Sequence, residues 1–127
     1  MSTLTAIEGL QEIAERFRSV AIENMDALKL IEKYDCKEAL IYCDPPYLPE
    51  TRHGSNANTY AFEMTYEDHE KLLHALNKCK ARVIISGYHS KLYDKKLSKW
   101  KTDSVEGKAH LANSGQLRNE LLWMNWK

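Results

Sequence analysis

The sequence predicts an α/β fold, and three observations lead to this prediction. Two short runs, Ala39–Cys43 and Arg82–Ser86, have the length and apolar content of buried strands. Segments in which apolar residues recur at helical spacing separate these runs. Two further strand candidates, near Trp100–Val105 and Asn119–Trp126, close the chain. Strands that alternate with helices and end in a closing pair predict a three-layer α/β/α sandwich, with the last strand in a central position.

The helices are predicted from the spacing of apolar residues. Leu10, Ile13 and Phe17 follow Thr5-x-x-Glu8, which resembles a capping box, so we expect a helix over about 5–18. The other helices are expected around Leu28 and Ile31, after Thr65-x-x-Asp68, and from Ser90 through Leu97.

The connecting segments carry two further predictions. Val20–Glu23 reads as a short strand that ends at the polar residues Asn24 and Asp26. Residues 48–61 are polar and irregular and contain nothing that would build a core, so we expect a mobile loop there.

Length and composition indicate a single domain over residues 1–127. The sequence contains no apolar run near the roughly 18 residues that a membrane span needs, and no signal-peptide pattern, so we expect a cytoplasmic protein with no membrane partner. Three cysteines, none at Cys-x-x-Cys spacing, indicate reduced thiols and no metal site. The formal net charge of zero is a mild argument against DNA binding, because phosphate contacts usually leave a basic excess.

The strongest chemical signal is Asp44-Pro45-Pro46-Tyr47, directly after the Ala39–Cys43 strand. Proline ends the strand because it lacks the N–H donor that a sheet interior requires. Ligands of open α/β sheets bind beyond the carboxyl ends of the strands, where Asp44 is expected to lie. The alternative is a simple strand-to-turn junction, but the position of the motif after a buried strand favours a functional site.

These residue types suit the methylation of an adenine amino group. The amino nitrogen is a poor nucleophile because its lone pair is delocalised into the ring. The Asp44 carboxylate and the Pro45 carbonyl could accept hydrogen bonds from both N–H groups and favour a tetrahedral nitrogen. The Tyr47 ring offers a surface on which a base extruded from the duplex can stack.

At these residues the chain resembles the Dam-type and phage-type adenine-specific DNA methyltransferases, which carry this DPPY motif. The resemblance extends to three further segments, Glu63–His69, Ser86–Tyr93 and Arg118–Trp123, and upstream to Ile22–Ala27. It implies the Rossmann-like fold of S-adenosylmethionine-dependent methyltransferases and one direct methyl transfer to adenine in double-stranded DNA, with the base flipped out. Restriction-modification, regulatory and phage roles are all compatible with it.

The resemblance also implies site residues. The catalytic positions are Asp44, Pro45, Pro46 and Tyr47. The cofactor neighbours are Asn24, Met25 and Asp26, together with Asp44. Arg52 and His53 follow the catalytic turn and could contact DNA phosphate, with simple loop solvation as the alternative.

The family begins with a glycine-rich loop that holds the cofactor, but no Gly-x-Gly occurs in this sequence. We therefore expect this chain to be the C-terminal catalytic half of such an enzyme, with an incomplete S-adenosylmethionine site. The strand over Ala39–Cys43 would then lack a neighbour, and the exposed edge would favour a homodimer, pairing with Val20–Glu23 or a missing N-terminal half. The alternatives are an inactive remnant, a nucleic-acid-binding module, or a methyltransferase that acts on RNA or protein.

Overall fold

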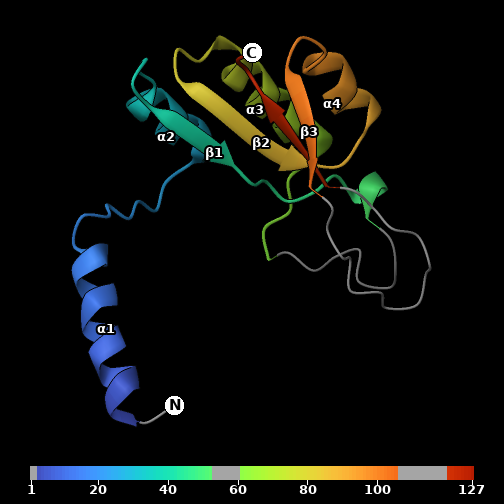
Figure 1. The fold of residues 1–127 in the computed structure, drawn as a ribbon. Helices are drawn as coiled ribbons and strands as arrows, with labels where there is room; N and C mark the ends of the chain where they lie inside the picture. The colour runs from blue at the N-terminus through green and yellow to red at the C-terminus, as the bar shows by residue number, and fades with distance from the viewer. Residues whose placement is uncertain (1–2, 53–60, 106–119) are drawn as a thin grey trace.

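The computed structural model describes residues 3–52, 61–105 and 120–127 (Figure 1). In chain order the elements are α1 (Thr3–Phe17), α2 (Ala27–Tyr34), β1 (Leu40–Cys43), the 3-10 helix η1 (Pro49–Thr51), α3 (Tyr66–Lys78), β2 (Arg82–Gly87), α4 (Lys91–Lys96), β3 (Lys101–Val105) and β4 (Glu120–Met124).

The strands form one mixed sheet in the order β1-β2-β4-β3. β1 and β2 are parallel, with Leu40 opposite Arg82 and Cys43 opposite Ile85. β4 runs antiparallel to both of its neighbours, and Ser86 of β2 lies opposite Leu122. The strands predicted in these four regions are confirmed, and so is the central position of the last one. The predicted burial of the strand over Ala39–Cys43 is wrong: no residue of β1 is buried, because β1 lies at the edge of the sheet and only one of its faces packs against helices.

The helices begin at polar residues that satisfy unpaired backbone N–H groups. Asp26 accepts hydrogen bonds from Leu28 N and Lys29 N at the start of α2. Thr65 and Asp68 form a capping box at the start of α3, where the sequence predicted a helix to begin, and Ser90 caps α4 through Tyr93 N.

One face of the sheet carries the hydrophobic core. Alternate strand residues, among them Val83, Ile85 and Trp123, are buried with side chains from α2, α3 and α4. In each strand the core residues are two positions apart and therefore point to the same face of the sheet. The three helices that pack against these residues thus cover one face. We name it the helical face. The molecule is therefore a mixed α/β structure, and the residues that the structure describes form two layers instead of the predicted three.

The opposite face, here named the open face, contains Leu40, Tyr42, Ile84, Leu122 and Met124. Leu40 and Tyr42 are 62% and 61% exposed, and the other three are half-buried. The predicted first helix exists as α1, but it extends away from the sheet, and Leu10, Ile13 and Phe17 stay exposed (Figure 1). The open face is thus uncovered by any described element.

The predicted strand at Val20–Glu23 is wrong. These residues have no regular secondary structure, and Ile22 is 85% exposed. Glu23 instead accepts hydrogen bonds from Lys33 and Tyr34 of α2. The segment does not pair with β1, which therefore lies at the edge of the described sheet. A strand pattern in the sequence produces a strand only where a neighbour supplies hydrogen-bond partners.

The prediction that residues 48–61 contribute nothing to the core is also wrong for their first part. Leu48 is 4% exposed and belongs to the core, and Thr51 is buried in η1. The Thr51 hydroxyl donates to Leu48 O over 2.7 Å, which closes this turn. The buried leucine anchors the segment that follows the Asp-Pro-Pro-Tyr motif.

No helix in the described ranges is both long enough and apolar enough to cross a membrane.

Candidate active site

Asp44 lies at the carboxyl edge of the sheet, one residue beyond the end of β1. The parallel register places it beside Ser86 of β2, whose hydroxyl lies 2.9 Å from Asp44 Oδ1 and 3.3 Å from Cys43 O. A hydroxyl has one proton, and the closer, charged acceptor is the better partner. Ser86 and Pro45 are buried and Pro46 is half-buried, whereas Asp44 is exposed. One carboxylate oxygen is therefore fixed from inside the protein while the group still faces solvent.

Tyr47 is held at its hydroxyl and at its ring. The hydroxyl donates to Glu120 Oε1 over 2.5 Å. The ring packs edge-on against Tyr88, with centroids 4.7 Å apart and an interplanar angle of 66°. Burial, followed by the hydrogen bond to Glu120 and the charges of Glu120 and Asp44, raises the pKa of Tyr47 well above its usual value. The phenol therefore stays neutral and remains a donor.

Arg52 binds back to the turn that carries the Asp44-Pro45-Pro46-Tyr47 motif. Its Nε donates to Tyr47 O over 2.7 Å, and Nη2 donates to the same carbonyl. Nη1 and Nη2 each donate to a Glu63 carboxylate oxygen over 2.8 Å. The Arg52 side chain is only 9% exposed. A DNA contact by Arg52 stays a prediction, and it would require this bidentate pair to open. His53, the other predicted DNA contact, lies outside the described residues.

The predicted cofactor neighbours lie at the start of α2. At the other end of this helix, Asp35 Oδ1 accepts from Lys80 N and Ala81 N, just before β2 begins. That contact places the end of α2 at the amino edge of the sheet and Asp26 toward the carboxyl edge. The Asp26 carboxylate is occupied as a helix cap, while Asn24 and Met25 are exposed.

A cavity of about 320 Å³ lies beside Asp26, between the starts of α2 and α3. This volume is near the lower limit for small-molecule sites. Its lining residues are Asp26, Ala27, Leu28, Met64, Asp68, Lys71 and Leu72.

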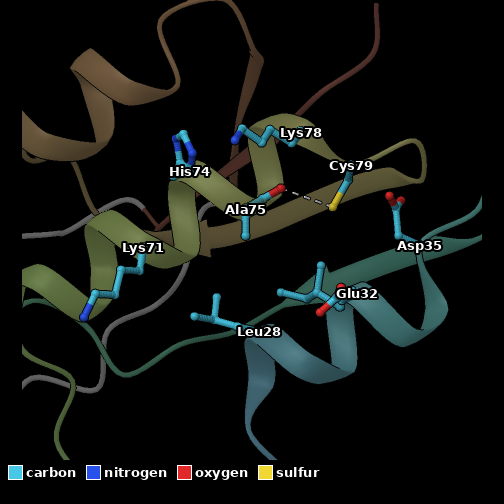
Figure 2. Close-up of a pocket in the computed structure, with 9 residues that line it drawn as sticks. Leu28, Glu32, Asp35, Lys71, His74, Ala75, Lys78 and Cys79 are labelled. Carbon is cyan, nitrogen blue, oxygen red and sulfur yellow. Dashed lines mark hydrogen bonds between the residues drawn. The ribbon is translucent and has the colours of Figure 1, made fainter.

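A second cavity, of about 440 Å³, lies between α2 and α3 (Figure 2). Figure 2 shows Glu32 and Asp35 on one wall and Lys71, His74 and Lys78 on the other. Burial raises the pKa of the Cys79 thiol at its end, so this sulfur is a weak nucleophile. None of the residues that line this second cavity belongs to the predicted site.

Three residues that the sequence did not single out complete the site: Ser86, Glu120 and Glu63. Each lies in a segment that carries the family resemblance, which is the signal that could have identified them. Their individual roles depend on contacts across the sheet. The described residues contain no cluster of histidine, cysteine and acidic side chains suited to a metal ion.

The chain is similar to one family of known proteins over most of its length. Residues 2–111 match a family described as D12 class N6 adenine-specific DNA methyltransferase. A search of curated proteins found no match.

Proposed function

The chain belongs to the D12 class of N6 adenine-specific DNA methyltransferases, and on this basis we propose that Asp44-Pro45-Pro46-Tyr47 is its catalytic motif. The proposed reaction transfers a methyl group from S-adenosylmethionine to the N6 amino group of an adenine flipped out of double-stranded DNA. The observation that carries the proposal is the Asp44 carboxylate, held by Ser86 at the exposed carboxyl edge beside a fixed Tyr47 ring. We further propose that the chain acts as the catalytic portion of a larger site.

The proposed chemistry uses groups of this chain. Asp44, with Oδ1 occupied by Ser86, accepts one N–H of the adenine amino group through its remaining acceptor positions. The Pro45 carbonyl accepts the other N–H. Together they favour a nitrogen whose lone pair is available for attack, and such preoriented acceptors act most strongly as charge develops in the transition state. Tyr47 stacks on the base, a contact worth about 1–3 kcal/mol.

S-adenosylmethionine supplies the electrophilic methyl group when it is bound. The residues present fit one end of such a molecule: Asn24 and Met25 are exposed toward the carboxyl edge, near the cavity of about 320 Å³. Asp26 would contribute only through its backbone or by leaving its capping position. Because the sequence lacks a Gly-x-Gly loop, we expect weak binding by this chain alone. Calorimetry that gives micromolar affinity for the cofactor would contradict this expectation.

A methyl-transfer assay tests the proposed function without knowledge of the target sequence. Labelled S-adenosylmethionine is incubated with unmethylated genomic DNA, with RNA and with protein. We expect label in DNA only, at N6 of adenine. Asp44→Ala should lower the rate by about a hundredfold or more, the size of effect seen when a preoriented transition-state contact is removed. Asp44→Asn should lose less, because its amide oxygen can still accept.

Asp103→Asn is a matched control, since Asp103 is an exposed aspartate on β3. Equal losses in the Asp44 and Asp103 variants would contradict the proposed role of Asp44. A chain that binds DNA but never transfers label would favour the binding-module alternative, and label in RNA or protein would favour a different substrate.

A further inference from the structure

The Tyr47 hydroxyl is tied to a strand far from it in the sequence. Glu120, the first residue of β4, accepts its hydrogen bond over 2.5 Å in a partly buried position. Backbone pairing on both sides of β4 places Glu120: Val105 lies opposite it on β3, and Leu121 lies opposite Gly87 on β2. The carboxylate therefore projects from a strand that is paired along both of its edges.

Strand geometry places Glu120 on the same face as the catalytic carboxylate. Leu121 and Trp123 are buried on the helical face, so Glu120 and Leu122 point to the open face. Ser86 lies opposite Leu122 and holds Asp44. Glu120, Ser86 and Asp44 thus share one face, and Tyr47 reaches Glu120 at the end of this face where Asp44 lies.

The other contacts of Tyr47 do not fix the position of its hydroxyl end, which is bound by Glu120. Arg52 holds the backbone carbonyl of Tyr47 and so fixes where its side chain starts. Tyr88 packs edge-on against the ring, which limits its position on one side. The Arg52 contact leaves the direction of the side chain open. The hydrogen bond from the hydroxyl fixes this direction, because it holds the far end of the side chain. The hydroxyl oxygen lies on the axis about which the ring turns, so the packing against Tyr88 limits that turn instead.

We propose that Glu120 is a positioning residue: it holds the hydroxyl end of Tyr47 and so sets where the ring lies, while Tyr88 limits how the ring turns, and the ring is thereby held in place for stacking on the extruded adenine. This inference rests on the proposed function of the Asp44–Tyr47 motif. Glu120 itself contacts neither the base nor the methyl group. The Glu120 carboxylate can accept this hydrogen bond only while the Tyr47 phenol keeps its proton. The raised pKa of Tyr47 is consistent with a protonated hydroxyl.

A double-mutant cycle tests the proposal through methyl transfer to unmethylated genomic DNA. Glu120→Ala should lower kcat/KM by about tenfold, a size typical of one coupled pair. Glu120→Gln should recover most of this loss, because its amide oxygen can accept from the Tyr47 hydroxyl. Tyr47→Phe keeps the ring but loses the hydrogen bond to Glu120, so its kcat/KM should resemble that of Glu120→Ala. The double variant should be no worse than Tyr47→Phe alone.

Fluorescence of a single-stranded oligonucleotide that contains 2-aminopurine gives an independent reading of stacking, because no base extrusion is needed. Wild type and Glu120→Gln should quench the base analogue, and Glu120→Ala should quench it less. Glu70→Ala, a surface variant whose partner is Lys96, should quench like wild type. Melting temperatures of all variants show whether each one is folded.

The outcomes separate the inference from the function on which it rests. If wild type neither methylates DNA nor quenches the analogue, the proposed function fails and this inference falls with it. If wild type does both, but Glu120→Ala lowers activity equally in the wild-type and Tyr47→Phe backgrounds, only the inference fails, because Glu120 would then act independently of the hydroxyl.

Discussion

The two faces of the sheet differ in what they contribute. On the helical face, Val83 and Ile85 are completely buried against α2, α3 and α4. On the open face, Leu40 and Tyr42 are mostly exposed, yet Asp44, Ser86 and Glu120 lie at its carboxyl end. The first face holds the fold together. The second face carries the residues proposed to act on adenine, and no described element covers its exposed apolar residues.

This difference explains how a short motif can be well ordered at an uncovered edge. Leu48 extends the core to the residue directly after the motif, and Arg52 ties the Tyr47 carbonyl to Glu63. The motif is therefore anchored from the helical side, while the Asp44 carboxylate stays exposed to solvent.

The largest expected effect compares neighbouring residues of β2 that point to opposite faces. Ile85→Ala should lower the free energy of unfolding by about 2–5 kcal/mol, because it removes buried methyl groups and leaves a cavity. Ile84→Ala, on the open face, should cost clearly less. Urea unfolding with a fitted slope measures both values. Equal losses would show that something covers the open face in solution.

The second prediction concerns self-association through the open face and the β1 edge. We expect the wild-type chain to form dimers, because the outer edge of β1, with no described strand beside it and with exposed apolar residues nearby, favours pairing with another chain. Tyr42→Glu should weaken this association, since a charge would have to be buried. Tyr66→Glu is the matched control, because Tyr66 is an exposed tyrosine at the start of α3, away from the open face. Sedimentation that shows wild-type monomers at every concentration would end the dimer hypothesis.

A smaller effect on stability is expected at Asp26, and it can distinguish a role as helix cap from a role as cofactor neighbour. As a helix cap it should stabilise the protein, so Asp26→Ala should cost about 0.5–2 kcal/mol, whereas Asp26→Ser should restore most of this because serine is also a good cap. Thermal unfolding measures the stability of each variant. If Asp26→Ser is as stable as wild type but loses all response to S-adenosylmethionine, the carboxylate has a cofactor role beyond capping.

The smallest expected effect is a change in stability with pH that comes from His69. This residue is buried in α3, and its Nδ1 lies 2.9 Å from the Tyr93 hydroxyl. Burial first, and then the nearby charge of Arg52, lower the pKa of His69 below its usual 6.5, despite the opposing charge of Asp68. Above pH 6.5 both folded and unfolded chains hold a neutral imidazole, so this group adds no pH dependence. As the pH falls below that value, the unfolded chain binds the proton first, and stability is lost. Unfolding measured from pH 7 downward should show this loss in wild type, and His69→Gln should lack that component.

The strands and the three core-facing helices were predictable from local patterns. Ala39–Cys43 is short, apolar and ended by prolines, so it could be recognised as a strand from adjacent residues, although the strand itself forms by pairing with β2. The capping box Thr65-x-x-Asp68 likewise forms from residues three apart. Failures occurred where a pattern needed a distant partner. Val20–Glu23 has the composition of a strand but no neighbouring strand among the described residues, and Leu48 is buried because side chains from several elements pack around it.

The sequence by itself determined the α/β class, the family, and a turn of Asp44, Pro45, Pro46 and Tyr47 after a strand, because these depend on residues adjacent in the chain. Only the tertiary structure decided which face of the sheet is covered, that Ser86 holds Asp44, and that Glu120 reaches the Tyr47 hydroxyl from 73 residues away. The physical reason is strand register. A shift of one residue in the pairing of β2 or β4 would turn Ser86 and Glu120 to the opposite face, and no local pattern specifies that register.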